Sequence, residues 1–468
     1  MQVKKNYLLV IAVCFVITYI VIRSYSVDFT HDEAYSFHNV KHFWYAESFC
    51  TANTHWLNSI AMKAASLLNL ENNWQLRWFS TVSAFVFFFI CFLWICSLDN
   101  IYHKVFACSV LLLSPYVIDY FGLARGYASG LMLEGLSLCF FIINFKRNKR
   151  LFSFLSLLCA ALSAIANYSF VYFFSAFAMV YFYVYYLRPK TALIKNKAFY
   201  TDIALCLAIS AFIVKAWIFI MRCSQDLGAG TDKITDVSLS FLADFFYQRI
   251  YLSGPLLLMT TCGLVTLLLI ICTYGVFMYK KHKQDLYFYT ALMLSLILFI
   301  LSVNFFCFKI VLPYARSALF LFPLISICII YFMNEVFRFK LKSVLFLLFS
   351  ILLSINFFRT ISLSHTFDFY QQEETRNVFN YVDSIKAKHV AMNWQTFGVY
   401  RNYYQMTNKL KYKFKGEFMN NNADVSDYDY LLLSPPYNLI PFNHSNVSVD
   451  TVLHFPKNNI VLLKVKAL

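Results

Sequence analysis

Long apolar runs separated by short polar connections organise most of this chain. A helix that crosses a bilayer needs about 20 apolar residues, or somewhat fewer where it is buried in a bundle. Runs of this kind cover residues 6–22, 78–98, 104–121, 127–145, 151–166, 168–187, 201–221, 256–279, 286–307, 317–335 and 343–359. The pattern predicts an all-α polytopic membrane protein with about eleven transmembrane helices.

The pattern changes after residue 364. Apolar runs become shorter, and charged residues and asparagine become more frequent. Helix-like segments at 369–388 and 397–406 alternate with strand-like segments at 389–394, 411–418, 428–433, 451–455 and 460–466. We therefore predict a transmembrane domain over residues 1–360, with a large first outer loop at 24–77, and a small α/β domain over residues 361–468.

Composition and charge placement agree with a membrane protein. The chain is 60% hydrophobic and 14% charged, whereas ordinary soluble domains carry about 25% charged residues. The net charge is +16, but the basic residues form short clusters between the apolar runs and no nucleic-acid-binding motif is present. This excludes a soluble enzyme and gives no support for a nucleic-acid partner.

The basic clusters also predict an orientation. With the N-terminus in the cytoplasm, the even-numbered connections fall inside, and nearly all the basic clusters lie in them. These connections are residues 99–104, 146–150, 188–197, 280–283 and 338–342. An odd number of spans then places the C-terminal domain outside, so we expect a multi-pass protein of the cell (inner) membrane with an extracytoplasmic tail.

Charged residues near a bilayer that serve no topological purpose are candidates for function. Removing the topological clusters leaves a short set, all in predicted outer connections. It consists of Asp32 and Glu33, His55, Arg77, Arg125 with Tyr127, Lys309 and Arg316.

This set suits glycosyl transfer from a polyprenyl-phosphate-linked sugar. One positioned carboxylate can accept the proton of the attacking hydroxyl, and we assign this role to Asp32, with Glu33 as its competitor. The leaving lipid phosphate needs positive charge, and the planar guanidinium of arginine matches phosphate oxygens. Arg125 and Arg316 are the candidates for that contact, with Lys309 and His55 as weaker ones.

Each assignment has a structural alternative. Asp32 could cap a helix that starts at Glu33. His55 could be an interfacial histidine beside an amphipathic helix at Trp56–Leu68, and Arg77 could anchor the second span at the interface. A single acidic pair offers too few ligands to argue a metal site, so the sequence implies no certain cofactor and leaves a divalent metal open.

The order of these motifs resembles the bacterial GT-C glycosyltransferases, the superfamily of protein O-mannosyltransferases and the lipid-A aminoarabinose transferase. The resemblance covers about residues 1–340 and implies a polyprenyl-phosphate-sugar donor and a glycan, lipid or protein acceptor at the outer membrane face. It implies functional roles for His55, Arg77 and Arg316. It also implies such roles for Asp32-Glu33, as the acidic first-loop motif, and for Arg125-Gly-Tyr127, as the "ARxY" motif. The chain departs from the family at Trp56-Leu57, which stand where a Pro-Pro or Pro-Leu pair is usual.

Two other functions have weaker support in the sequence. An O-antigen polymerase or ligase also has many spans and essential arginines, but its large outer loop usually lies late in the chain. A flippase or transporter of lipid-linked sugars favours internal repeats and helices broken by glycine or proline. The chain shows no repeat, and it has only 11 glycines and 9 prolines.

Overall fold

The computed structural model describes residues 7–41, 55–187, 197–222, 230–282, 285–336, 339–412, 414–419, 425–433, 447–455 and 460–467. The chain forms two compact units, each built from segments that are distant in sequence. The helical unit comprises Met1–Ile20, Phe49–Asn58 and Trp78–Ile361. The tail unit comprises Val21–Ser48, Ser59–Arg77 and Ser362–Leu468.

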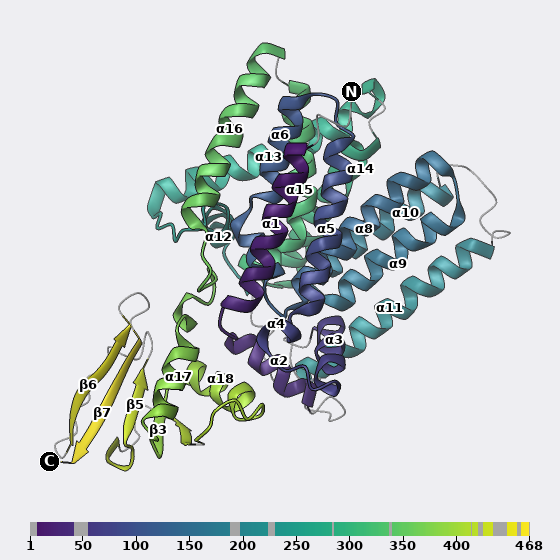
Figure 1. Cartoon of the computed structure of the whole chain (residues 1–468). Coiled ribbons are helices and arrows are strands. Elements are labelled where there is room, and N and C mark those ends of the chain that lie inside the picture. The colour runs from purple at the N-terminus through teal and green to yellow at the C-terminus, as the bar shows by residue number, and fades with distance from the viewer. Residues whose placement is uncertain are drawn as a thin grey trace. The chain divides into compact units, whose positions relative to one another are not determined.

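The helical unit is a bundle of mostly long apolar helices (Figure 1). Its elements are α1 (Tyr7–Ser26), whose last turns belong to the tail unit, α5 (Trp78–Cys96), α6 (Ile101–Leu112), α7 (Pro115–Phe121), α8 (Gly126–Arg147), α9 (Arg150–Ala166), α10 (Val171–Phe182), α11 (Lys197–Arg222), α12 (Ile234–Phe246), α13 (Gly254–His282), α14 (Asp285–Phe308), α15 (Phe322–Val336) and α16 (Phe339–Thr360).

The predicted polytopic architecture is confirmed. In the described part of the chain, 9 helices are long and apolar enough to cross a membrane, and a bent pair raises the number to 10. That pair is α6 and α7, which meet at 54° within the predicted span 104–121. Pro115 is the first residue of α7, and because proline lacks a backbone N–H it begins a new helix there instead of continuing the old one. The predicted span 151–166 is the shorter apolar helix α9.

Aromatic rings hold the centre of the helical unit together. Phe141 of α8 makes edge contacts with Phe177 of α10 at 5.4 Å and with Tyr289 of α14 at 5.5 Å between ring centroids. Phe145, one turn further along α8, stacks on Tyr289 at 5.1 Å. Such pairs stabilise beyond their buried area, so the aromatic content of the sequence is used for helix packing.

The tail unit contains a five-stranded sheet and several short helices (Figure 1). Its elements are α2 (His31–Lys41), most of α3 (Trp56–Leu67), α4 (Asn73–Leu76), α17 (Thr375–Ser384), β3 (His389–Met392), α18 (Trp394–Val399), β4 (Lys415–Phe418), β5 (Tyr430–Leu433), β6 (Val447–Phe455) and β7 (Ile460–Ala467). The strand order is β4-β3-β5-β7-β6. Strand β3 is parallel to β4 and β5, and the other pairs are antiparallel.

Segments of the first loop and the C-terminal chain are bonded to each other inside the tail unit. The buried guanidinium of Arg23 donates to the backbone oxygens of Ser362 and His365. The hydroxyl of Ser26 donates to the Leu363 oxygen at 2.6 Å. Phe29 stacks on Tyr403 at 4.1 Å between centroids. The first loop, apart from its segment Phe49–Asn58, therefore belongs to the same compact unit as the sheet.

Candidate active site

The acidic motif of the first loop lies at the start of helix α2. The helix begins at His31. The Thr30 backbone N–H and hydroxyl both donate to Glu33 Oε2, at 2.9 and 3.0 Å, and the Glu33 backbone N–H donates back to the Thr30 hydroxyl at 3.3 Å. This reciprocal arrangement is a capping box. Thr30 and Glu33 thus cap the helix, and Asp32 lies within its first turn.

Glu33 and Arg77 form an ion pair in which neither side chain is exposed to solvent. Arg77 Nε and Nη2 donate to the two oxygens of Glu33, at 2.7 and 2.6 Å. The remaining N–H groups donate to the backbone oxygens of Ser24, Val27 and Asp28, at 3.0, 2.8 and 2.9 Å. Because guanidinium has five donors, these bonds use all of them, and the pair fixes the first loop against the end of α1.

Asp32 is the more accessible carboxylate of the acidic pair. Its side chain is 13% exposed, and its Oδ1 lies 3.7 Å from Nδ1 of His31. The His31 ring packs on Trp394 at 4.3 Å between centroids, and the His31 backbone N–H donates to the Gln372 side chain at 2.6 Å. Sequence reasoning did not single out Trp394 or Gln372, because both come from the C-terminal chain and no local pattern ties them to the first loop.

The "ARxY" motif lies in the helical unit, at the start of helix α8. Arg125 is the N-cap residue of α8 and is 1% exposed. Tyr127 is buried, with its ring 4.8 Å from Tyr120 and 5.4 Å from His55. The structure therefore brings three of the predicted residues, His55, Arg125 and Tyr127, to one end of α8. The dipole of a helix favours anions near its N-terminus.

Gly126 is required for this arrangement because the chain passes very close to its neighbours there. A Cβ atom at Gly126 would lie 2.0 Å from the backbone oxygen of Ala166 and 2.8 Å from Nδ1 of His55. The side-chain amide of Asn58 donates to the Ala124 oxygen at 2.7 Å. The segment after His55 is thus bonded to the turn that carries Arg125.

Arg316 and Lys309 lie in the late outer connection, also in the helical unit. Arg316 is half-buried in the 3-10 helix η6 (Ala315–Leu321), which packs against α8. The Ala315 backbone N–H donates to the Ser240 hydroxyl of α12 at 2.8 Å. Lys309 is exposed and has a positive φ of 57°. Arg316 is therefore on an element that packs against α8, and Lys309 is on the exposed part of the connection.

A buried carboxylate near the "ARxY" turn was not among the sequence candidates. Asp119 of α7 is 3% exposed, and the hydroxyl of Tyr247 donates to its Oδ2 at 2.6 Å. Tyr247 is the C-cap of α12, with a φ of 52°. The bond ties the end of α12 to the helix that precedes Arg125. In the sequence, the one indication of Asp119 as a candidate is that it lies in a short predicted span followed by a tight turn.

The described residues contain no group of three or more His, Cys, Asp or Glu side chains that could hold a metal ion. The acidic candidates, Asp32 and Glu33, and the basic candidate Arg77 belong to the tail unit. The other candidates, His55, Arg125, Tyr127, Lys309 and Arg316, belong to the helical unit. Within each unit the structure places candidates next to one another: Glu33 with Arg77, and His55 with Tyr127.

The bundle of apolar helices with a small sheet domain defines a polytopic membrane protein with a GT-C-like fold, which confirms the fold that the motif order predicted. The chain is similar to ArnT from Cupriavidus metallidurans in the apo state, with a TM-score of 0.52 and 9% identity over 97% of each chain. It is also similar to ArnT from the same organism bound to undecaprenyl phosphate, with a TM-score of 0.54 and 9% identity over 98% of each chain. No protein-family model and no curated protein sequence matches the chain.

Proposed function

We propose that this chain is a membrane glycosyltransferase that moves a sugar from a polyprenyl-phosphate donor to a glycan, lipid or protein acceptor. The observation that carries the proposal is the likeness of nearly the whole chain, 98%, to ArnT bound to undecaprenyl phosphate. A fold can host more than one function. The proposal therefore also rests on the charged residues of the first loop and of the "ARxY" turn, which supply the chemistry that such a transfer needs.

The two carboxylates of the acidic motif differ in what they can do. Glu33 is fully buried and its oxygens accept bonds from Arg77 and Thr30, so we propose a structural role for it. Asp32 is partly exposed and is not the helix cap. We therefore propose Asp32 as the general base, which removes the proton of the acceptor hydroxyl as that oxygen attacks the anomeric carbon.

The leaving group in this reaction is a lipid phosphate, which is stable as an anion. Arg125 at the N-terminus of α8 is our proposed phosphate contact, because guanidinium and helix N-terminus both favour an anion. Arg316, in the 3-10 helix that packs against α8, is proposed as a second phosphate contact. Lys309 and His55 remain weaker candidates. The proposed site is in the cell membrane, with the acceptor side extracytoplasmic.

The test is transfer or slow hydrolysis of radiolabelled sugar from a panel of short-chain polyprenyl-phosphate donors by the purified full-length protein. Asp32→Asn should lose about 10²- to 10⁴-fold in rate, the usual contribution of a general base. Its melting temperature should match that of the wild type. The matched control is Asp368→Asn, which changes an exposed carboxylate of the same unit.

Two outcomes would count against the proposal. Full activity of a folded Asp32→Asn variant would remove Asp32 as the base while leaving the reaction class in place. Tight binding of the lipid phosphate with no turnover on any donor would favour a flippase of lipid-linked sugars instead.

A further inference from the structure

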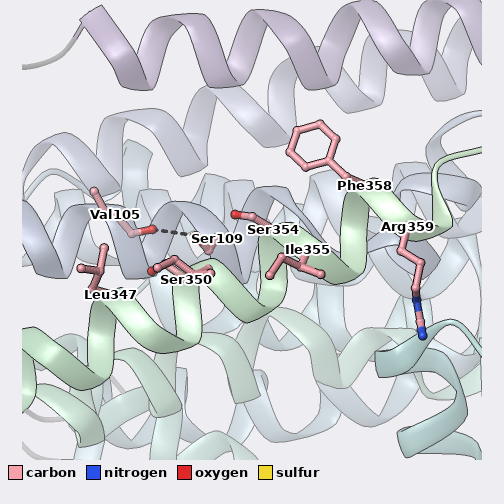
Figure 2. Close-up of a pocket in the computed structure, with 9 residues that line it drawn as sticks. Val105, Ser109, Leu347, Ser350, Ser354, Ile355, Phe358 and Arg359 are labelled. Atoms are coloured by element: carbon pink, nitrogen blue, oxygen red, sulfur yellow. Dashed lines mark hydrogen bonds between the residues drawn. The ribbon is translucent and has the colours of Figure 1, made fainter.

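An open groove runs between helices α6 and α16 of the helical unit, and none of the candidate active-site residues lines it. Its volume is about 570 Å³. The residues that line it are Val105, Ser109, Leu347, Ser350, Ile351, Ser354, Ile355, Phe358 and Arg359. Figure 2 shows the serines in a row along the groove, with Arg359 at one end.

The groove follows from the break between α6 and α7. Where the two helices are in contact, Phe106 of α6 stacks on Phe346 of α16 with centroids 4.9 Å apart and planes 8° from parallel. Beyond that point, α6 ends at Leu112 and the chain bends by 54° into α7. The small side chains of Ser109, Ser350 and Ser354 leave open space between α6 and the second half of α16.

The groove wall suits a hydrocarbon chain better than a polar ligand. The hydroxyl of Ser109 donates to the Val105 oxygen at 3.0 Å, and the hydroxyl of Ser350 donates to the Phe346 oxygen at 2.6 Å. Both bonds run to the preceding turn of the same helix, so these polar groups are already satisfied. Phe358 closes one side of the groove and contacts Phe15 of α1 at 6.1 Å between centroids.

The length of the groove and the charge at its end indicate the kind of lipid. From Leu347 to Phe358 the helix rises about 16 Å at 1.5 Å per residue, which is close to half of a hydrocarbon core of about 30 Å. Arg359 lies at that end. Its guanidinium donates to the Phe246 oxygen and to Asn356 Oδ1, each at 3.2 Å, and no carboxylate among the described residues pairs with it. An apolar groove that is about as long as one leaflet and ends at a cation suits a phospholipid, with the acyl chain in the groove and the phosphate at the cation.

We propose that this groove binds one glycerophospholipid with a net anionic headgroup. An acyl chain fills the space between α6 and α16, and the phosphate lies at Arg359, where a charge-assisted hydrogen bond can form. The lipid would act as a packing partner for the second half of α16. The proposal does not depend on the proposed function, since it requires neither a sugar donor nor turnover.

The test is native mass spectrometry of the full-length protein titrated with phosphatidylglycerol or phosphatidylcholine that carry the same acyl chains. The wild type should bind the first phosphatidylglycerol about tenfold more tightly than phosphatidylcholine. Arg359→Gln should bring this ratio close to one. Ser354→Leu, which fills the groove with a larger side chain, should weaken both lipids about tenfold.

Two matched variants serve as controls. Ser302→Leu changes an exposed serine of α14 whose hydroxyl also bonds to its own helix, and Arg222→Gln removes an exposed arginine at the end of α11. Both should leave the lipid ratio and affinity unchanged. The proposal fails if the wild type shows no preference for phosphatidylglycerol, or if the control variants lose as much affinity as the groove variants. It also fails if undecaprenyl phosphate displaces phosphatidylglycerol at equal concentration, because the occupant would then be a polyprenyl lipid.

Discussion

Arg77 and Glu33 form a doubly hydrogen-bonded ion pair, with nitrogen-oxygen distances of 2.7 and 2.6 Å and no solvent exposure of either side chain. The two residues are 44 positions apart in the chain. The same guanidinium binds the backbone oxygens at the end of α1 and the start of the first loop. The pair therefore joins α1, α2 and α4 in the tail unit.

Removing either partner of this pair should destabilise the tail unit. Arg77→Met leaves a buried carboxylate and three backbone oxygens without their donor, and Glu33→Gln leaves a buried guanidinium with weakened pairing. Breaking one side of a buried ion pair costs about 3–5 kcal/mol. We expect a large fall in melting temperature for both variants, measured by thermal unfolding in detergent. A melting temperature within one degree of wild type for Arg77→Met would contradict the structural role of the pair.

The closeness of Gly126 to its neighbours leads to a second prediction. Gly126→Ala places a methyl group against the Ala166 oxygen and His55, and overpacking of this kind costs about 1–3 kcal/mol. The matched control is Gly263→Ala in α13, where a Cβ would meet nothing within 4 Å. Because alanine favours helix over glycine by about 1 kcal/mol, the control should be neutral or more stable. Equal melting temperatures for the two variants would argue against the close packing at α8.

Glu134 of α8 is a buried carboxylate whose two oxygens have no hydrogen-bond partner among the described residues. Burying a polar group without a partner is unfavourable by about 1–3 kcal/mol. Glu134→Met, which has a similar volume, should therefore raise the melting temperature. If this stabilised variant also loses sugar transfer, then Glu134 is retained for function. A fall in melting temperature would instead show that Glu134 supports the fold.

The pH dependence of tail-unit stability should include a contribution from Asp28. Burial raises the pKa of this carboxyl above its ordinary value of 3.8, although the Arg376 backbone N–H donates to it and the Arg376 side chain lies nearby. A carboxyl whose pKa is raised in the folded protein adds stability below its unfolded pKa. That stability is lost as the pH rises through the folded pKa.

Asp28→Asn removes this titration and keeps an acceptor for the Arg376 N–H. The melting temperature of the variant relative to wild type should therefore be higher at pH 7 than at pH 4. Other carboxylates titrate in both proteins, so the difference between the two proteins isolates Asp28. The assignment is wrong if the difference is the same at both pH values or has the opposite sign.

Much of the fold could be predicted because it depends on local patterns. The apolar runs near 78–98, 286–307 and 317–335 became helices at Trp78–Cys96, Asp285–Phe308 and, after a 3-10 turn, Phe322–Val336. The amphipathic segment predicted at Trp56–Leu68 is a helix at Trp56–Leu67. The strand-like segments at 428–433 and 460–466 became strands β5 and β7. In each case hydropathy and spacing within one segment are sufficient.

Other features depended on contacts between distant segments. The predicted helix at 369–388 is only Thr375–Ser384, because a 3-10 turn at Tyr370–Gln372 precedes it and Glu374 takes a φ of 70°. The backbone N–H of His31 bonds to the Gln372 side chain in that turn. A helical pattern in the sequence does not reveal such a competing contact.

The features of the candidate site also divide into those that the sequence predicts and those that depend on contacts between distant segments. The sequence by itself determined which charged residues serve no topological purpose, because hydropathy and the placement of lysine and arginine identify the others. Only the tertiary structure decided that Glu33 pairs with Arg77, that Thr30 caps α2 in place of Asp32, and that most of the first loop belongs with the C-terminal sheet. These features rest on hydrogen bonds and packing between residues far apart in the chain, which no periodicity within a single segment encodes.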